Sequence, residues 1–342
     1  MSTPMPDWKN LILHGDCLDV IEKHKDILKG QVRLIYIDPP FFSGTDYTIK
    51  IRSNGDSQKA GTLKEEKTYS DKWEGGLQEY LDFMRVRLNA MKPLLKDNGS
   101  IWVHLDWHVS HYIKVILDQI FEYSNFVNEI VWKRTNSPKA QSNSFGSQHD
   151  VILLYAVDAS KFKTQQVYRK LDAKSRRPYS YKDERGRFRL IEIEAQGIQW
   201  TEERKQFEWR GRTAPYLYRK EILDEWWKEG LIYTSRNGRY TKKQYLSEVP
   251  GVPVSDLWID INPVQGASKE NTGFLTQKPE ALLERIIESS SDPGDIVADF
   301  FAGSGTTAAV AEKMNRRWII CDSSEAAIRV IETRLGKSMA TF

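Results

Sequence analysis

Residues 295–322, DIVADFFAGSGTTAAVAEKMNRRWIICD, hold the pattern that decides the fold. The runs 295–298 and 318–321 are short, apolar and followed by an aspartate, as is typical of buried parallel strands. Between them, a glycine-rich turn leads into a helical pattern over 305–314. A strand, a glycine turn, a helix and a second strand form a βαβ unit, so this stretch predicts an open α/β sheet.

The same alternation of strands and helices extends over much of the chain. Strand-like runs at 11–14 and 32–37 end in polar residues. Helical patterns are expected at 77–95, 107–121, 279–289 and 324–335. The sequence therefore predicts an α/β fold with a doubly wound, mostly parallel, Rossmann-like sheet.

One segment, 157–250, breaks this rhythm because it is polar, rich in arginine and aromatic. We interpret it as an insertion that divides the main domain into a first part, 1–156, and a second part, 251–342. Residues 133–250 carry 25 Lys and Arg against 15 Asp and Glu, whereas the whole chain has a net charge of only +3. A solvated basic face is one reading, but interleaved tryptophans favour contact with nucleic acid. These tryptophans are Trp200, Trp209, Trp226 and Trp227.

Composition bounds the remaining possibilities. The chain has 342 residues, of which 40% are hydrophobic, enough for a sizeable core. No signal peptide and no stretch of roughly 18 apolar residues is present, so a soluble cytoplasmic enzyme is expected. The two cysteines suggest neither a disulfide nor a zinc site. A polar, glycine-containing stretch at 43–72 is expected to be a long mobile loop, either a lid or a disordered insertion.

The tetrad Asp38-Pro39-Pro40-Phe41 is the first candidate for chemistry, because it follows the strand-like run 32–37. Ligands of open α/β sheets bind at such strand ends. Two prolines fix the backbone and remove two N–H donors, so the turn presents a carboxylate and bare carbonyls to an amine. Phe41 is placed to stack on a base. A proline-stiffened turn without a functional role is the alternative.

Two further stretches suit a nucleotide-like ligand. The glycines of the loop 299–307 allow close approach to a ligand, and Asp322 after the next strand suits ribose hydroxyls. Dinucleotide-binding proteins use a related loop, whose third glycine is replaced here by Ala308. Near the N-terminus, Asp16 is a candidate acceptor for an adenine amine, or the N-cap of a helix, or both.

In their order, these motifs resemble the β class of bacterial DNA amino-methyltransferases, which act on N6 of adenine or N4 of cytosine. Asp38 to Phe41 looks like the catalytic motif of that family, and Phe301 to Gly305 looks like its cofactor loop. Matches at 99–106, 149–155 and 276–279 lie between them, so the resemblance covers most of the chain outside 157–250. The family's motif usually ends in Tyr, and this chain has Phe41 in its place. The phenyl ring keeps the stacking face but lacks the hydroxyl.

The resemblance implies S-adenosylmethionine as cofactor and a site for each part of it. Asp16 and Cys17 would flank the adenine, Asp322 would hold the ribose, and 276–278 would close the pocket. The catalytic residues would be Asp38, Pro39, Pro40 and Phe41. The cofactor-binding residues would be Asp16, Cys17, Asp38, Thr276, Gln277, Lys278, Asp299, Phe300, Phe301, Ala302, Gly303, Ser304, Gly305, Thr306 and Asp322. No metal is implied.

The resemblance also implies a site-specific enzyme that methylates N6 of adenine in double-stranded DNA by base flipping and in-line displacement, with 157–250 as its target-recognition module. Adenine is favoured because the family's N4-cytosine enzymes usually begin the motif with Ser rather than Asp. The alternatives are an N4-cytosine enzyme, a dinucleotide-dependent oxidoreductase and a catalytically silent DNA-binding subunit. A bacterial, nucleoid-associated location, a homodimer and a cognate restriction endonuclease are further expectations.

For methyl and amine to meet, the strand before Asp38 and the strand before Asp299 must be neighbours in the sheet.

Overall fold

The structure, a computed structural model, describes residues 9–52, 63–135, 143–195 and 206–338. Contacts between residues divide the chain into a larger unit, 1–167 with 255–342, and a smaller unit, Tyr168–Val254. The sequence placed the insertion at 157–250, so the smaller unit begins later and ends slightly later than expected. Trp200, one of the tryptophans proposed to contact nucleic acid, lies outside the described residues.

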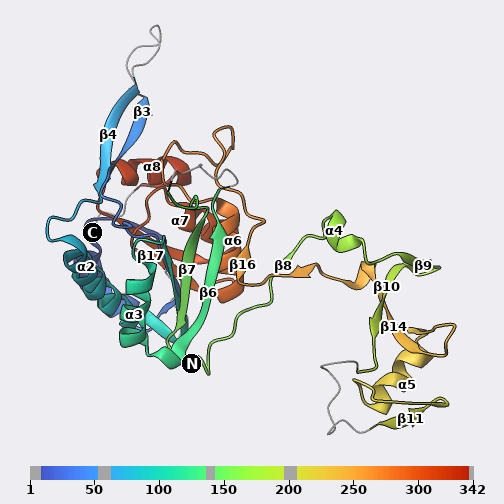
Figure 1. The fold of residues 1–342 in the computed structure, drawn as a ribbon. Helices are drawn as coiled ribbons and strands as arrows, with labels where there is room; N and C mark the ends of the chain where they lie inside the picture. Colours follow the sequence, from blue (N-terminus) through green and yellow to red (C-terminus); the bar gives the residue numbers. More distant parts are fainter. Residues whose placement is uncertain (1–8, 53–62, 136–142, 196–205, 339–342) are drawn as a thin grey trace. The chain divides into compact units, whose positions relative to one another are not determined.

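An eight-stranded sheet forms the centre of the larger unit (Figure 1). Its strand order is β1-β18-β17-β2-β5-β7-β6-β16. Strand β7 runs antiparallel to both of its neighbours, and the other neighbouring pairs are parallel. The strands are β1 (Leu11–His14), β2 (Val32–Ile37), β5 (Leu95–Leu105), β6 (Phe126–Lys133), β7 (His149–Ala156), β16 (Leu257–Trp258), β17 (Ile296–Asp299) and β18 (Arg317–Asp322). The predicted mostly parallel α/β sheet is confirmed.

Helices cover both faces of this sheet (Figure 1). On one face α1 packs on α2 and α2 on α3, and α6 and α7 pack together on the other. The helices are α1 (Cys17–Leu28), α2 (Gly76–Met91), α3 (Ser110–Phe121), α6 (Glu280–Ser290), α7 (Thr306–Lys313) and α8 (Glu325–Leu335). None of the helices in the described ranges is long and apolar enough to cross a membrane.

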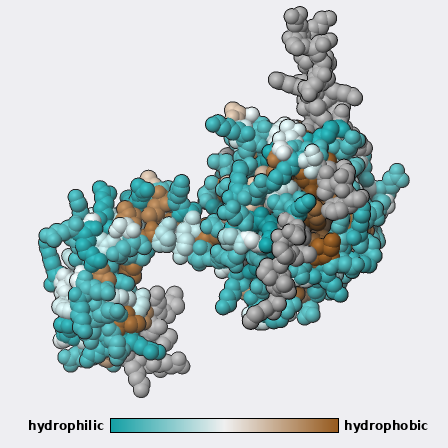
Figure 2. All heavy atoms as spheres, turned by 180° about the vertical axis from the view of Figure 1, so that it is seen from behind, coloured by the Kyte–Doolittle hydropathy of each residue, from teal (hydrophilic) through white to brown (hydrophobic). Residues whose placement is uncertain are grey.

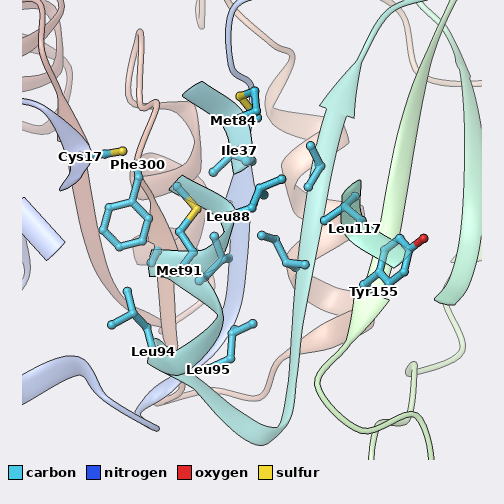
Figure 3. Close-up of a cluster of buried hydrophobic side chains, with 14 of the residues drawn as sticks. Cys17, Ile37, Met84, Leu88, Met91, Leu94, Leu95, Leu117, Tyr155 and Phe300 are labelled. Atoms are coloured by element: carbon cyan, nitrogen blue, oxygen red, sulfur yellow. The ribbon is translucent and has the colours of Figure 1, made fainter. Parts of the chain in front are cut away.

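The core beneath α1, α2 and α3 reaches the end of the sheet where the sequence motifs lie. Figure 3 shows part of it, with Met84, Leu88 and Met91 of α2 among the buried side chains. Cys17 and Phe300 belong to the same cluster. The motifs therefore begin where a rigid, fully apolar core ends, which fixes the backbone that carries them.

Two expected helices are shorter than their sequence patterns. The helix expected over 77–95 ends at Met91, because Pro93 lies in a 3-10 turn and lacks the N–H that a continuing helix needs. Leu95 instead begins β5. The helix expected from residue 107 begins at Ser110, because the side chain of Asp106 accepts from the N–H of His108 and holds a turn before the helix.

The stretch 43–72, expected to be a mobile loop, contains a β-ribbon instead. Strands β3 (Asp46–Arg52) and β4 (Leu63–Ser70) pair antiparallel, and the connection 53–62 lies outside the described residues. The rings of Tyr47 and Tyr69 stack across the ribbon with centroids 4.6 Å apart. Such cross-strand pairs stabilise an antiparallel ribbon, and they outweigh the polar composition on which the loop prediction rested.

The smaller unit has a sheet of its own in the order β13-β14-β10-β9. Its core includes Trp209, Tyr216 and Leu223. Figure 2 shows a mainly hydrophilic surface on this unit. Its elements are β8 (Tyr168–Arg169), α4 (Ala173–Arg176), β9 (Tyr181–Asp183), β10 (Gly186–Glu192), β11 (Phe207–Trp209), β12 (Arg212–Ala214), α5 (Lys220–Lys228), β13 (Ile232–Thr234), β14 (Tyr240–Tyr245) and β15 (Val252–Pro253).

Candidate active site

The two candidate motifs lie on neighbouring strands, as the sequence argument required. Strand β2, which ends before Asp38, pairs parallel with β17, which ends at Asp299. From β2 the sheet continues to β5, and from β17 it continues in the opposite direction to β18. Open α/β sheets bind ligands at the carboxyl ends of strands where the order reverses in this way.

A cavity with a volume of about 660 Å³ opens at this point. Cavities of this size hold small molecules and cofactors. Of the residues singled out from the sequence, it is lined by Asp16, Cys17, Asp38, Pro39, Pro40, Phe41, Thr276, Gln277, Lys278, Asp299, Phe300, Phe301, Ala302, Gly303, Ser304, Thr306 and Asp322. The structure thus brings together motifs separated by more than 200 residues.

Asp38 directly follows the end of β2. One of its carboxylate oxygens is paired with a cation, and the other has no hydrogen-bond donor among the described residues. The ammonium of Lys278 pairs with its Oδ2. Its Oδ1 is buried and has no hydrogen-bond partner among the described residues. An unsatisfied buried carboxylate oxygen is costly unless a ligand supplies the donor. The carbonyl of Pro40 accepts from the Tyr80 hydroxyl at 2.8 Å.

Phe41 packs on a buried polar network that the sequence analysis did not identify. Its ring lies 6.0 Å from that of His104, nearly parallel to it. The Nδ1 of His104 lies 2.9 Å from the Tyr36 hydroxyl, and its Nε2 lies 3.2 Å from Oδ2 of Asp150. An imidazole proton on Nε2 satisfies both contacts, because Tyr36 then donates to Nδ1 and Asp150 accepts from Nε2. This network fixes the surface on which Phe41 rests.

Neighbouring groups stabilise the ionised carboxylate of Asp150. Burial alone would raise the pKa of its carboxyl, but the hydrogen bond from His104 and the charges of Lys278 and Arg134 hold that pKa below its usual range. Arg134 Nε lies 2.9 Å from Oδ1 of Asp150. Asp150 and Arg134 also line the cavity. The network therefore places an ion pair in the same cavity as Asp38 and Phe41.

The glycine loop after β17 needs its glycines for two different reasons. Gly303 has a φ of 52° and lines the cavity, and its N–H donates to Oδ2 of Asp322 at 2.8 Å. Gly305, with a φ of 74°, is the N-cap of α7 and does not line the cavity. A Cβ on Gly305 would lie 2.9 Å from Cγ1 of Ile331. Gly305 therefore packs the loop against α8, and the cofactor contact expected of it stays a prediction.

Asp322 lies at the end of β18, beside the glycine loop. Besides the bond from Gly303, it accepts from the N–H of Ser324 at 2.9 Å. Burial raises the pKa of its carboxyl, while these two hydrogen bonds act against that rise. Its carboxylate orders both the glycine loop and the start of α8, and it still lines the cavity.

Asp16 is the N-cap of α1 and also pairs with an arginine of α2, while its contact with an adenine amine stays a prediction. Its Oδ1 accepts from the N–H of Leu18 at 2.8 Å, so the N-cap is confirmed. Its Oδ2 pairs with Arg87, which is 8% exposed and lies over the ring of Phe83 at 3.4 Å. Burial raises the pKa of the neighbouring Cys17 thiol to about 12, so the thiol stays protonated at neutral pH.

Gln277 lines the cavity, but its amide is already engaged in its own loop. Its Oε1 accepts from the N–H and hydroxyl of Thr272 at 2.9 and 2.7 Å, and its Nε2 donates to the Glu270 carbonyl at 2.6 Å. These bonds fold the segment that carries Lys278 towards Asp38. Gln277 therefore shapes the wall of the cavity.

Because the carboxyl of Asp299 is buried, we expect the unfolding free energy of the protein to depend on pH. Burial raises the pKa of its carboxyl to about 7, although hydrogen bonds from Thr307 and the Phe301 N–H lower it. Because the folded-state pKa lies above the ordinary value near 4, Asp299 stabilises the fold at low pH and loses this contribution as pH rises through about 7. We expect Asp299→Asn to lose less unfolding free energy than wild type between about pH 5 and about pH 8. Urea titrations at both pH values check this, and equal losses in the two proteins would contradict it.

The sequence analysis did not identify several contacts at the site. They include the carboxylate of Asp71 on the turn after Phe41, the network around His104, and Arg87 on Asp16. The partners in these contacts lie at least 28 residues apart, so periodicity could not reveal the pairing. A buried charge within a helical pattern, such as Arg87 in α2, was the available signal.

Similarity to known proteins agrees with this geometry. The model of the DNA methylase family matches residues 32–333. The chain is 31% identical to the Type II methyltransferase M.EcaI of Enterobacter cloacae, over 90% of this chain and 65% of that protein. It is 28% identical to the Type III restriction-modification enzyme StyLTI Mod subunit of Salmonella typhimurium, over 93% of this chain and 53% of that protein. The chain thus spans about half to two thirds of these relatives.

Solved structures show the same fold. The PvuII DNA methyltransferase (cytosine-N4-specific) aligns with a TM-score of 0.51 and 14% identity, covering 95% of this chain and 86% of that one. The DNA modification methylase TTHA0409 of Thermus thermophilus, complexed with S-adenosyl-L-methionine, aligns with a TM-score of 0.50 and 15% identity, covering 98% of this chain and all of that one. At these identities the likeness is one of fold.

Proposed function

This chain belongs to the DNA methylase family, and from that premise we propose that it transfers a methyl group from S-adenosylmethionine to N6 of adenine in double-stranded DNA. One observation carries the proposal. The buried, partnerless Oδ1 of Asp38 and the glycine loop after Asp299 border the same cavity, on neighbouring strands. A hydrogen-bond acceptor for an amine and a loop for a nucleotide-like cofactor are therefore within one site.

The residues that line the cavity fit S-adenosylmethionine. Gly303 lets the backbone approach a ligand closely, and the carboxylate of Asp322 suits a ribose diol. Asp16, with its Oδ2 on Arg87, offers a carboxylate for an adenine amine. S-adenosylmethionine would supply a methyl group already activated on a sulfonium. The protein's own contribution is then to bind, orient and exclude water.

Asp38 acts on the amine that receives the methyl group. The lone pair of an aromatic amine is delocalised into the ring, and two acceptors on its hydrogens favour the pyramidal form that frees it. The Oδ1 of Asp38 and the Pro39 carbonyl supply these acceptors, while Lys278 holds Oδ2. As positive charge grows on the amine, both acceptors gain interaction energy, which is the differential binding that catalysis requires.

The base must leave the duplex to reach this cavity, at a cost of a few kcal/mol for unpairing. Phe41 offers a face for stacking, held in place by His104. We assign target recognition to the smaller unit, where Arg210 lies over the ring of Trp227 at 4.2 Å and Lys242 over Trp226 at 3.8 Å. Cations interleaved with aromatic rings suit phosphate contact and base stacking.

Adenine is proposed over cytosine because the motif begins with Asp38. The fold does not discriminate, since the PvuII enzyme shares it and is described as cytosine-N4-specific. Expression in a bacterium that lacks both modifications, followed by nucleoside chromatography of its DNA, tests the choice. We expect N6-methyladenine. N4-methylcytosine in its place would contradict the choice of base and leave the proposed chemistry intact.

The cofactor is tested independently of DNA. A dinucleotide-dependent oxidoreductase would also use a glycine loop and Asp322, but it leaves the acceptor pair at Asp38 without a role. We expect calorimetry to show S-adenosylhomocysteine binding on the order of tenfold or more tighter than NAD. Tighter binding of NAD would favour the oxidoreductase.

Partners beyond DNA are also proposals. Relatives such as the StyLTI Mod subunit carry restriction-modification in their names. We propose that a cognate restriction endonuclease recognises the same DNA sequence as this chain, and that two copies of the chain associate. Size-exclusion chromatography with light scattering, with and without DNA, checks the second point. A monomer under both conditions would contradict it.

A further inference from the structure

The carboxylate of Asp71 accepts five hydrogen bonds, and four of them come from the turn that follows the catalytic motif. Its Oδ2 accepts from the N–H groups of Phe41 and Ser43 at 3.1 and 2.6 Å and from the Ser43 hydroxyl at 2.7 Å. Its Oδ1 accepts from the N–H of Phe42 at 3.0 Å and from the indole of Trp73 at 2.9 Å. Asp71 is 1% exposed and is not among the residues that line the cavity. It therefore reaches the site through the groups it holds and not by lining the cavity.

The turn needs such an anchor. Pro39 and Pro40 have no N–H, so the first main-chain donors after Asp38 belong to Phe41, Phe42 and Ser43. All three converge on one anion, as in the concave backbone arrangements that bind anions. Phe42 has a φ of 64°, which is unfavourable for a residue with a Cβ. Hydrogen bonds to a charged acceptor are strong enough to offset that strain.

The main chain of Asp71 belongs to the base of the β3–β4 ribbon. Its N–H donates to the Thr45 carbonyl at 2.9 Å, and its carbonyl accepts from the N–H of Gly44 at 3.1 Å. The residue directly follows β4, which ends at Ser70. Any displacement of the ribbon base must therefore move the carboxylate that holds Phe41.

Trp73 connects the same anchor to the other side of the motif. Its indole donates to Asp71, and its ring packs edge-on against Tyr80 with centroids 5.2 Å apart. The Tyr80 hydroxyl donates to the Pro40 carbonyl. Asp71 thus holds the donors of the turn directly, and Trp73 packs against the tyrosine that donates to the Pro40 carbonyl.

We infer that Asp71 is a positioning residue that sets the place of Phe41 against the target base and couples the ribbon to it, an inference that rests on the proposed methyltransferase function. With its N–H donors satisfied by Asp71, the turn leaves the acceptors of Asp38 and Pro39 unopposed for the amine. Loss of a merely structural residue would weaken the fold and cofactor binding together. Loss of a positioning residue is expected to change how the target base is held and to leave cofactor affinity unaltered.

The test compares Asp71→Asn with Asp82→Asn, a matched change at an exposed carboxylate on α2. The amide keeps the shape of the carboxylate but loses its charge and one of its two acceptor atoms. We expect Asp71→Asn to lower kcat about tenfold or more and to weaken the fluorescence response of 2-aminopurine placed at the target base. Affinity for S-adenosylhomocysteine is expected to stay within about twofold of wild type.

A double variant shows whether the loss of kcat arises through Phe41. Combined with Phe41→Ala, Asp71→Asn is expected to add little to the loss of kcat, because both changes act through one ring. Additive losses, or an affinity for S-adenosylhomocysteine that falls together with kcat, would overturn the inference. An unchanged kcat would overturn it too. Should Asp71→Asn fail to fold, Ser43→Ala removes a single bond to the same carboxylate and is expected to give a smaller loss of the same kind.

Hydrogen exchange separates this inference from the proposed function. We expect the amides of Phe41, Phe42 and Ser43 to exchange faster in Asp71→Asn than in wild type or Asp82→Asn. If wild-type protein moved no methyl group, the proposed function would fail, while faster exchange would still support the anchor. Unchanged exchange at these amides would overturn the anchor whatever the activity.

Discussion

Asp38→Ala is expected to lower kcat for methyl transfer by at least about 100-fold, the effect seen when one preorganised partner of a developing charge is removed. The substitution deletes the buried Oδ1 acceptor and the partner of Lys278. Because the lost interaction grows as charge develops on the amine, it should appear in kcat more than in KM. Single-turnover kinetics with saturating cofactor and DNA measure this directly.

Asp38→Asn and Asp26→Asn serve as comparisons for this loss. Asp38→Asn keeps the size of the side chain and one acceptor, so we expect a loss smaller than that of Asp38→Ala. Asp26 is exposed on α1, and its change to Asn is expected to leave kcat unaltered. Wild-type kcat in Asp38→Ala would refute the assignment, as would a fall in kcat matched by lost binding of S-adenosylhomocysteine.

Gly305→Ala is expected to destabilise the protein by about 2–5 kcal/mol and to weaken cofactor binding about tenfold. A left-handed φ of 74° costs a residue with a Cβ about 1–2 kcal/mol. The new Cβ would also lie 2.9 Å from Cγ1 of the fully buried Ile331, where overpacking costs about 1–3 kcal/mol more. Relief of the clash must shift the loop that carries Gly303, which lines the cavity.

Gly336→Ala is the matched control for the packing part of this effect. Gly336 has a φ of 61°, but no atom lies within 4 Å of a Cβ placed there. We expect this change to cost only about 1–2 kcal/mol of unfolding free energy and to leave cofactor affinity unaltered. Urea denaturation and calorimetry with S-adenosylhomocysteine compare the two. Equal destabilisation in both variants would contradict the packing role of Gly305.

The sequence predicted those parts of the fold in which a local pattern and the buried environment agree. Strands β2, β17 and β18 are largely apolar, an aspartate ends or directly follows each of them, and each lies where it was expected. The neighbouring placement of β2 and β17 followed from the methyl-transfer mechanism that the family resemblance implied, because the amine and the methyl group must meet. The prediction of a loop at 43–72 was wrong, because strands β3 and β4 both carry charged residues. These residues hide the alternation of polar and apolar side chains that would mark a strand.

The contacts that tune the site could not be predicted, because they join residues far apart in sequence. Lys278 and Asp38 are 240 residues apart, and nothing local marks the ammonium as the partner of that carboxylate. Asp71 follows a polar strand, where an aspartate is usually solvated. Its burial depends on the prolines, whose missing N–H groups shift the donors of the turn to the next three residues. The motifs indicate which chemistry to expect, and tertiary packing determines how it is held.

The most direct test of methyl transfer to DNA uses the purified chain, tritiated S-adenosylmethionine and double-stranded bacterial DNA of mixed sequence. We predict that label enters DNA, that it is recovered as N6-methyladenine, and that it is absent with Asp38→Ala. Label that never enters DNA at any base, from a folded protein that binds S-adenosylhomocysteine, would contradict the proposed function.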